Sequence, residues 1–267
     1  MAQLPKTITI NKKVGETPLQ ALDAFRLRDP RFAEVKLAYA GRLDPMAEGK
    51  LLVVVGEECK NHAAYLGLDK EYVIEVVFGA SSDTGDVLGV IRACDPAPIE
   101  ERMLERAIKA RVGKSVMPFP IYSSKPVRGK PLFQWALEGK LDEIEIPIQE
   151  SRIYSMNLDS FTTILSDELE RRISESIESL PIVTEASKAE GRDFRRDEVR
   201  ASWRKVFDER GQDSYTVAEI RVVCSSGTYM RTLAEALATD LGTCGLALSI
   251  KRTKIGRFRF GLWLKRF

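Results

Sequence analysis

Asp44 is the side chain best placed for chemistry, in the stretch AYAGRLDPMAEGKLLVVVG (38–56). Glycines on both sides of the acid let the backbone turn tightly, and Pro45 fixes the backbone directly after it. Leu51–Val55 then offers a continuous apolar run, which predicts a strand buried on both faces. An acid on a rigid turn beside a buried strand can aim one carboxylate into a cleft. The simpler interpretation is a turn in which Asp44 bonds its own backbone, and this stretch alone favours it.

Residues 117–139, MPFPIYSSKPVRGKPLFQWALEG, mix prolines, basic side chains and aromatic rings. The basic residues are Lys125, Arg128 and Lys130, and the aromatic residues are Phe119, Tyr122, Phe133 and Trp135. The prolines oppose regular structure until about Leu132. Such a segment suits an arm that lies on nucleic acid, with charges for phosphates and rings for bases. An irregular surface loop whose rings fill the core fits the composition equally well.

A second basic segment, KRTKIGRFRF, follows the apolar strand expected at Leu246–Ile250. Its cations are Lys251, Arg252, Lys254, Arg257 and Arg259. A solvated edge strand would use these charges to prevent pairing with another sheet. We favour the alternative, an edge that binds phosphates.

The segment 165–212 differs from the rest because acids and bases alternate and aromatic residues are few. LERRISESIESL has helical spacing, and Arg195–Glu209 predicts a second helix with Trp203 and Phe207 on one side. We expect a charged helical insert, partly disordered, with a solvated face. A role in gripping RNA is the less favoured alternative.

The 267 residues, 44% of them hydrophobic, suffice for one large domain spanning 1–267 with a sizeable core. No run reaches the roughly 20 apolar residues that cross a bilayer, so we expect no membrane partner. The N-terminus MAQLPKTITI lacks a secretory signal, which predicts a cytoplasmic protein. A net charge of +2 does not by itself indicate a partner.

The counts of metal-binding and redox residues exclude several classes of site. His62 is the single histidine, which excludes most histidine triads and multi-histidine metal sites. The cysteines, Cys59, Cys94, Cys224 and Cys244, contain no C-x-x-C pair, so we expect buried free thiols rather than a zinc site or a disulfide. Neither a Walker A loop nor a G-x-G-x-x-G fingerprint occurs. We therefore predict no cofactor and no metal.

Local patterns predict the elements that would surround Asp44. Strands are expected at Thr7–Ile10, Leu51–Val55, Glu71–Gly79, Val87–Ala93, Ile144–Tyr154, Tyr215–Cys224 and Leu246–Ile250, and helices after Thr17 and at Asn61–Leu68, Pro98–Val112 and Tyr229–Leu241. The turn SSDTGD would pair Glu71–Gly79 with Val87–Ala93 as a hairpin. The helix from Pro98 would turn Met103, Leu104, Ala107 and Ile108 inward.

Four stretches in order resemble the TruB family of tRNA pseudouridine(55) synthases. AGRLDPMAEGKLLVVVGEECK is similar to the family's G-x-LDP-x-A-x-G block, and KEYVIEVVFGASSDTGDVLG to its K-x-Y strand and D-T-x-D turn. PFPIYSSKPVRGKPLFQWA resembles its YSA-x-K arm, and VVCSSGTYMRTLAEALATDLG its C-S-x-GTY-x-R-T block. NKKVGETPLQAL resembles its opening block, and the Arg-Thr pair at 252–253 its final motif. Four blocks in the family order are specific, and they reverse the preference for a simple turn at Asp44.

The resemblance implies a role for each matching residue. Asp44 would be the catalytic carboxylate, acting either as a nucleophile or as the base that forms a glycal. Arg231 would pair with it and keep it ionised, because burial alone raises the pKa of a carboxyl. Tyr72 would stack on the extruded base, and its hydroxyl would help remove the C5 proton. Tyr229 and Ile250 would line the uracil pocket, and Lys60 would serve structure or face phosphate.

The chain departs from the family pattern in three places. Tyr39 stands where the family usually has a histidine that supports the flipped loop; tyrosine can stack but carries no positive charge. Lys13 replaces a proline in the opening block. The sequence stops at Phe267 directly after the basic strand, so we expect no C-terminal PUA domain, and the 165–212 insert would partly replace its RNA contact.

These inferences predict an α+β pseudouridine synthase fold, with a central mixed, mostly antiparallel sheet flanked by helices. The expected substrate is uridine 55 in the T-stem-loop of tRNA, flipped out of its stack at a cost of a few kcal/mol. We expect a monomer without a protein partner. The alternatives are a non-catalytic tRNA-binding or folding module and a synthase for another RNA. Asp44, Tyr72 and Arg231 are all present, which argues against the first alternative.

Overall fold

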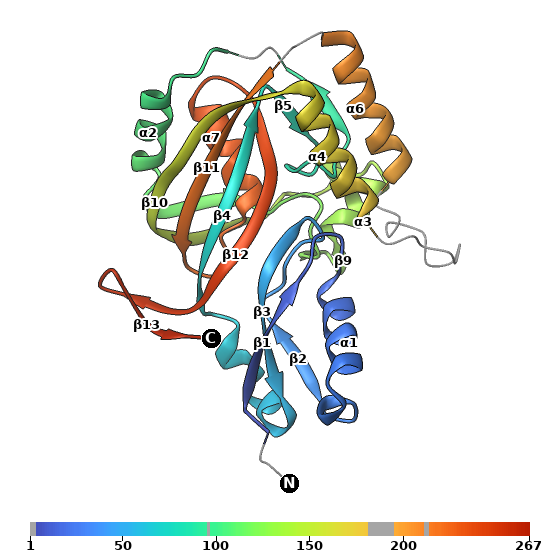
Figure 1. The fold of residues 1–267 in the computed structure, drawn as a ribbon, viewed down its shortest axis with the longest axis vertical. Coiled ribbons are helices and arrows are strands. Elements are labelled where there is room, and N and C mark those ends of the chain that lie inside the picture. The colour runs from blue at the N-terminus through green and yellow to red at the C-terminus, as the bar shows by residue number, and fades with distance from the viewer. Residues whose placement is uncertain (1–3, 95–96, 181–194, 211–213) are drawn as a thin grey trace.

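The computed structural model describes residues 4–94, 97–180, 195–210 and 214–267 (Figure 1). The strands are β1 (Thr7–Lys12), β2 (Leu37–Ala40), β3 (Ala47–Val55), β4 (Asp69–Phe78), β5 (Ala80–Ser82), β6 (Ile91–Ala93), β7 (Gly113–Pro118), β8 (Pro126–Val127), β9 (Lys130–Pro131), β10 (Ile148–Leu165), β11 (Ser214–Cys224), β12 (Gly245–Arg259) and β13 (Leu262–Arg266). The helices are α1 (Pro18–Arg28), α2 (Glu101–Ala110), α3 (Leu132–Leu137), α4 (Ser166–Glu178), α6 (Arg196–Arg210) and α7 (Met230–Asp240), with the 3-10 helices η1 (Pro30–Phe32), η2 (Gly56–Tyr65) and η3 (Leu141–Glu143). Within these ranges no helix combines the length and apolar character needed to cross a membrane.

The main sheet confirms the predicted α+β class. Its strands follow the order β1-β3-β12-β4-β11-β10-β7, with β2 paired to β3 and β13 paired to β12. The pair β3–β12 is parallel, and the other pairs are antiparallel. Leu51–Val55 is buried throughout, as its continuous apolar run predicted. The sheet is therefore mixed and mostly antiparallel.

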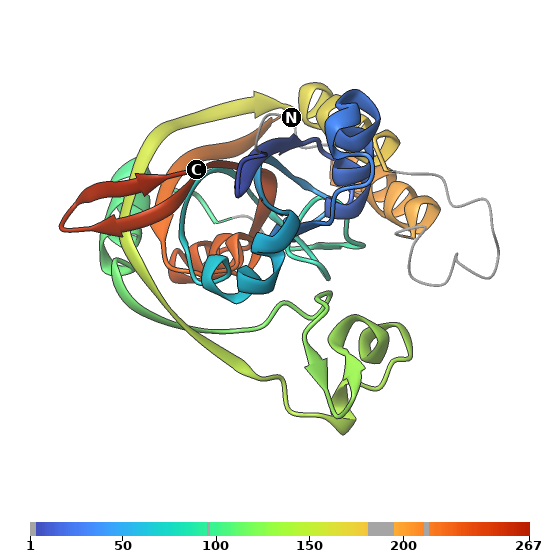
Figure 2. The same ribbon diagram turned by 90° about the horizontal axis from the view of Figure 1, so that it is seen from below.

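Helices cover both faces of this sheet. Tyr72, Ile74, Val76 and Phe78 of β4 join one hydrophobic core with α2 and α7, as their alternation predicted. Val77 of the same strand belongs to a second core, which includes α4 and α6. The strands curve around α7 (Figure 2), so its buried side is fixed from several directions. A helix packed in this way holds the side chains of its first turn in a defined position.

The prediction that Glu71–Gly79 and Val87–Ala93 pair as a hairpin is wrong. β4 pairs instead with β11 and β12, which come from the last third of the chain. The turn after β4 leads into a separate two-stranded sheet, in which β5 pairs with β6. β4 has apolar residues on both faces and so belongs at the centre of a sheet, where a strand needs two neighbours. The short turn suggested only the nearest partner.

The insert forms helices as predicted, but it is packed more deeply than its charge suggested. α4 and α6 lie side by side (Figure 1). The two helices bury Leu169, Ile173, Ile177, Val199, Trp203 and Val206 in the second core. The Trp203 indole also donates a 3.0 Å hydrogen bond to the Val87 carbonyl. Residues 181–194 and 211–212 of the insert lie outside the described residues, so the partial disorder expected for the insert stays a prediction.

The segment 117–139 stands out from the body as an arm (Figure 2, green). Between the end of β7 at Pro118 and the start of α3, its regular structure consists of the short paired strands β8 and β9. Phe119 and Trp135 lie in a small core with Leu132 and Ile144. Tyr122 and Phe133 instead line a cavity described below. The rings are thus divided between packing and an open cavity, and contact of the arm with nucleic acid stays a prediction.

The cysteines differ from the expectation of free thiols. Cys94 and Cys244 form a disulfide with a Cα–Cα distance of 6.4 Å, within the range such bonds require. The two residues are 150 positions apart, so no local spacing indicated the pair. Cys224 is a buried free thiol, as predicted, and Cys59 is a half-buried one.

Candidate active site

The loop that carries Asp44 is fixed by a buried arginine of β12. Arg252 is 1% exposed, although the sequence favoured it as part of a phosphate-binding edge. Its guanidinium donates to the carbonyls of Gly41, Arg42 and Lys50, at 3.1, 3.1 and 2.7 Å. Arg252 therefore uses its donors to hold the backbone on both sides of Asp44, rather than presenting them to solvent.

A buried lysine of β1 holds the same loop from the other end. The Lys12 ammonium donates to the carbonyls of Lys13 and Pro45, at 2.9 and 3.3 Å, and also bonds that of Ala47. Burial lowers the pKa of Lys12 to about 8. Gly49 closes the loop at φ +105°, where an added Cβ would lie 2.3 Å from the Arg252 carbonyl oxygen. The turn at Asp44 is thus built into the sheet.

Arg231, in the first turn of α7, pairs with Asp44. Its Nε lies 2.8 Å from Asp44 Oδ2, its Nη1 donates to the Thr84 carbonyl at 2.8 Å, and its Nη2 to the Tyr122 carbonyl at 3.2 Å. The Arg231 side chain is 4% exposed, whereas that of Asp44 is 38% exposed. The acid is consequently open to a ligand while its cation is not. The structure brings together the two residues that the resemblance paired.

Asp86 is a further charged neighbour, which the sequence had placed only in a turn motif. Its Oδ2 lies 3.7 Å from Arg231 Nε. Its Oδ1 accepts bonds from the Thr84 hydroxyl, at 2.7 Å, and from the Leu88 N–H, at 3.0 Å. In the sequence Asp86 is the second aspartate of the D-T-x-D turn. A turn accounts for an aspartate at that position, so nothing there indicated its proximity to Arg231.

The charges around Arg231 perturb one another. Burial on its own would lower the pKa of Arg231, but the carboxylates of Asp44 and Asp86 raise it. Burial raises the pKa of Asp86 despite that cation. Burial likewise raises the pKa of Glu235, one helical turn further along α7, to about 7. One guanidinium thus serves several acids, and Asp44 is the one it contacts most closely.

Two cavities meet at Asp44. The smaller, of about 310 Å³, is lined by the predicted residues Tyr72, Tyr229, Ile250, Lys125 and Arg252. Burial raises the pKa of Tyr72, so its phenol stays protonated near neutral pH. A protonated phenol can stack and hydrogen-bond but is not a ready base. Both the size and the lining of this cavity suit a flat ring placed beside the carboxylate.

The larger cavity, of about 500 Å³, lies beneath the arm and is also lined by Arg231. Tyr39 lines it, and its carbonyl lies 2.9 Å from His62 Nε2. Tyr122 and Phe133 of the arm contribute rings to its wall. The Tyr39 side chain is therefore next to the space above Asp44, where the family histidine was expected to act.

The remaining predicted binding residues lie away from Asp44. Lys60 is exposed on η2 and pairs with Glu57. Arg128 donates to the Glu143 carbonyl at 3.1 Å, within the arm region. Lys130 pairs with Glu138 and lies 3.8 Å from the centre of the Trp135 ring. These three cations line neither cavity at Asp44, so any contact with a ligand would be made outside them.

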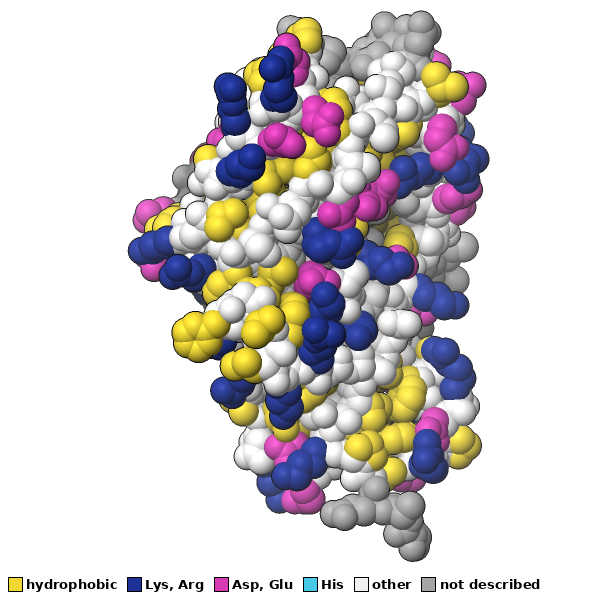
Figure 3. Space-filling view, turned by 60° about the vertical axis from the view of Figure 1, so that its left-hand side comes forward, with side chains coloured by type: hydrophobic (Ala, Val, Ile, Leu, Met, Phe, Trp, Pro, Cys, Tyr) yellow, Lys and Arg dark blue, Asp and Glu magenta, His cyan; other side chains and the backbone are white. Residues whose placement is uncertain are grey.

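The basic residues of β12 are partly paired. Lys251 lies 3.2 Å from Glu48, Lys254 2.7 Å from Glu71, and Arg259 3.5 Å from Asp69. The β12–β13 hairpin projects from the body (Figure 1) and exposes Phe260, Leu262 and Leu264. On the face seen in Figure 3, lysine and arginine side chains gather across the middle beside hydrophobic ones.

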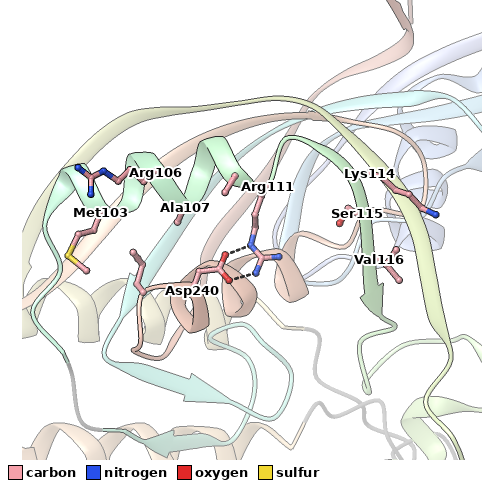
Figure 4. Close-up of a pocket in the computed structure, with 10 residues that line it drawn as sticks. Met103, Arg106, Ala107, Arg111, Lys114, Ser115, Val116 and Asp240 are labelled. Atoms are coloured by element: carbon pink, nitrogen blue, oxygen red, sulfur yellow. Dashed lines mark hydrogen bonds and ion pairs between the residues drawn. The ribbon is translucent and has the colours of Figure 1, made fainter.

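A third hollow is more voluminous but does not resemble an active site. It measures about 730 Å³ and lies between α2, β7 and the end of α7 (Figure 4). Its carboxylate, Asp240, is held by Arg111 through bonds of 2.5 and 2.7 Å. Met103, expected to point inward, is 40% exposed and lines this hollow. Arg111 binds both carboxylate oxygens of Asp240, and the described residues that line this hollow include no aromatic ring. Arg231 binds only one oxygen of Asp44, and aromatic rings line the two cavities that meet there, so those cavities are the better candidates.

Comparisons with known proteins show the family of the chain. Residues 30–177 match the TruB family pseudouridylate synthase (N terminal domain). The tRNA pseudouridine synthase B of Bordetella avium (strain 197N) is 30% identical over 259 residues, covering 96% of this chain and 82% of that protein. That of Caldicellulosiruptor saccharolyticus is 26% identical over 251 residues, covering 94% of this chain and 67% of that protein.

A solved structure shares the fold. A chain in the crystal structure of a Cbf5-Nop10-Gar1 complex superposes with a TM-score of 0.54 at 16% identity. The alignment covers 94% of this chain and 48% of the solved one, so this chain spans about half its length. The family model and the 30% identical relative carry the assignment. The chain belongs to the TruB family of pseudouridylate synthases and is an isomerase of that family.

Proposed function

We propose that this enzyme converts a uridine of tRNA to pseudouridine, specifically uridine 55 in the loop of the T-arm. The observation that carries the proposal is the half-exposed Asp44 carboxylate, paired with buried Arg231 where two cavities meet. The curated relatives are named tRNA pseudouridine synthase B, which supports tRNA as the substrate. The position of the uridine rests on the sequence blocks shared with the family.

The reaction rearranges bonds without changing composition. The bond between ribose C1′ and uracil N1 breaks, the base turns, and C1′ bonds to C5. The C5 proton leaves, and N1 gains a proton. Asp44 acts on the sugar or the base, as nucleophile or as general base, and Arg231 orients its carboxylate through the 2.8 Å bond. Tyr72 supplies a ring beside the turning base in the smaller cavity.

The substrate base must leave its stack to reach Asp44. Flipping a loop nucleotide costs a few kcal/mol, and the rings around both cavities offset this by stacking. In this proposal the phosphates are contacted by Lys125, Arg128 and Lys130 of the arm and by the exposed cations of β12, which are Lys251, Arg257 and Arg259. We propose further that the protein acts in the cytoplasm without a protein partner.

The test is release of tritium from a tRNA transcript labelled with [5-³H]uridine, for the wild type and Asp44→Asn. Asparagine keeps the size of the side chain but removes the carboxylate, so turnover should fall by a factor of about a thousand or more. Binding of the tRNA should be nearly unchanged. Release by both proteins would remove Asp44 from the chemistry. Binding without release by either would favour a non-catalytic tRNA-binding module or a different RNA substrate.

A further inference from the structure

Arg195 forms a junction between three separate parts of the chain. Its Nη1 lies 2.6 Å from Asp83 Oδ2 and its Nη2 3.0 Å from Asp83 Oδ1, which makes a bidentate pair. Its guanidinium carbon also lies 4.4 Å from the centre of the Tyr122 ring. Arg195 precedes α6 of the insert, Asp83 belongs to the turn after β5, and Tyr122 belongs to the arm. The pair is largely shielded from water, with side chains 19% and 15% exposed.

Two of these three parts are firmly attached to the body. The Val90 N–H donates to Asp83 Oδ1 at 2.9 Å, which fixes the carboxylate within its turn. The helix after Arg195 is tied to the same region by the Trp203 bond to Val87. The Ile91 N–H also donates to the Ser202 hydroxyl, at 3.1 Å. The Asp83–Arg195 pair is therefore a fixed platform, and the arm is the part that rests on it.

Tyr122, the arm residue that packs on this pair, also contacts Arg231 of the catalytic pair. The ring of Tyr122 packs on Arg195, while its carbonyl accepts a bond from Arg231 Nη2 at 3.2 Å. The next residue, Ser123, lines both cavities at Asp44. Among the described residues its hydroxyl has no hydrogen-bond partner. The position of Tyr122 thus sets both a contact of Arg231 and the placement of a free hydroxyl beside the substrate space.

We propose that Arg195 is a positioning residue that holds the arm over Asp44. Paired with Asp83, it offers a planar cation on which Tyr122 stacks, and this keeps the first part of the arm against Arg231. Arginine is suited to the task because its fork binds a carboxylate through its edge and leaves its flat face for a ring. The expected effect of Arg195 on tRNA turnover rests on the proposed function, whereas its effect on the attachment of the arm is independent of that function.

Limited digestion with trypsin measures that attachment directly. Within 117–139 the basic residues are Lys125, Arg128 and Lys130, and the first and last are followed by proline. Trypsin cuts poorly before proline, so Arg128–Gly129 is the cleavable bond of the arm. Its cleavage, followed by mass spectrometry, reports how often the arm opens. The cut at position 195 itself is resolved by mass and does not enter the measurement.

The variants are Arg195→Ala, Tyr122→Leu and Tyr122→Phe, with Arg200→Ala as the matched control. Arg200 lies on α6, the helix that follows Arg195, and pairs with Glu178 and Asp197, away from the arm. Loss of the stacked cation should speed cleavage at Arg128–Gly129 by about three- to tenfold. Tyr122→Leu should match Arg195→Ala, and Arg200→Ala should not change the rate. Tyr122→Phe keeps the ring on Arg195 but removes the hydroxyl that interacts with Asp83, so its rate should lie between those of the wild type and Tyr122→Leu.

The double variant Arg195→Ala/Tyr122→Leu decides whether the two residues act together. If they do, its cleavage rate equals that of either single variant. Unchanged cleavage in Arg195→Ala, or fully additive effects in the double variant, would overturn the proposal. In tRNA assays Arg195→Ala should raise KM and lower kcat, with Arg200→Ala unaffected. An inactive wild type with the expected cleavage pattern would reject the proposed function and leave the attachment of the arm standing.

Discussion

Arg231 Nε and Asp44 Oδ2 lie 2.8 Å apart although 187 positions separate the two residues. Different parts of the fold position the two residues. Asp44 sits on a turn held by Arg252 and Lys12, and Arg231 opens a helix enclosed by the sheet. The pair joins a half-exposed acid to a buried cation, so the carboxylate faces the cavities while most of the arginine side chain is enclosed by the protein.

Arg231→Lys should disable the enzyme while preserving the charge. Lysine has one donor group and cannot at once reach Asp44, the Thr84 carbonyl and the Tyr122 carbonyl. Hydrogen bonds of charged groups are worth about 1.5–3 kcal/mol each, so we expect kcat to fall at least about a hundredfold. The measurement is tritium release at saturating tRNA.

Arg111→Lys is the matched control for that substitution. Arg111 likewise binds a carboxylate, in its case through two nitrogens, but its partner is Asp240 in the groove of Figure 4. The activity of the Arg111→Lys variant should remain close to that of the wild type. Equal losses in both variants would mean that the effect comes from weakened folding rather than from the catalytic pair.

The sequence predicted single elements better than their partners. The alternation of β4 and the capped helix after Thr17 depend on neighbouring residues, and both are found. The partners of β4 depend on strands far along the chain, so the local turn led to a wrong hairpin. The disulfide between Cys94 and Cys244 was not predicted for the same reason, because its two residues lie far apart in the sequence.

The site shows the same division. Spacing alone favoured a plain turn at Asp44, and only the family blocks related it to Arg231 and Tyr72. Asp86 was visible in the turn motif, but its role depends on a cation that comes from α7. Arg252 was assigned to phosphate because composition counts charges and does not show which way a side chain points.

Glu235→Gln should stabilise the protein in a pH-dependent way. Burial raises the pKa of this carboxyl to about 7, above the ordinary value of 4.5. The folded state then holds a proton that the unfolded state has lost, so wild-type stability falls as the pH rises from about 4.5 to about 7. Glutamine stays neutral. The variant should match the wild type near pH 4 and exceed it by on the order of 2 kcal/mol at pH 8.

Urea unfolding at several pH values measures this difference. Glu105→Gln, at an exposed position on α2, is the control and should show no such trend. A difference between Glu235→Gln and the wild type that is constant from pH 4 to pH 8 would contradict the prediction, because the raised pKa would then have no energetic consequence.

Arg252→Met and Lys251→Met separate loop support from phosphate binding. Arg252→Met leaves three loop carbonyls without their buried donor, at a cost of about 1–3 kcal/mol for each group left unpaired. We expect lower stability and lower kcat. Lys251 is exposed beside Glu48, so its loss should leave the protein stable and weaken tRNA binding mainly at low salt.

Thermal unfolding and binding as a function of salt give the two readouts. If Arg252 bound phosphate instead, its loss would flatten the salt dependence of tRNA binding and leave the unfolding temperature unchanged. That result would restore the interpretation favoured from the sequence.

Trp203→Ala tests whether the insert is part of the folded body. Trp203 is 2% exposed, stacks on Phe207 and donates to the Val87 carbonyl. Removing a buried tryptophan typically costs about 3–5 kcal/mol, because a cavity remains and the Val87 carbonyl loses its donor. Arg204→Ala, at the exposed neighbouring position, should change stability by less than about 0.5 kcal/mol.

Guanidinium unfolding of both variants gives the comparison. The expected loss of stability would show that α4 and α6 belong to the second core. Deleting 165–212 would then weaken the fold as well, so tRNA binding by a deletion protein could be interpreted only after that protein is shown to be folded. A Trp203→Ala protein as stable as the wild type would instead mean that the insert folds independently of the sheet. Its helices would then be free to serve RNA binding alone, as the sequence alternative suggested.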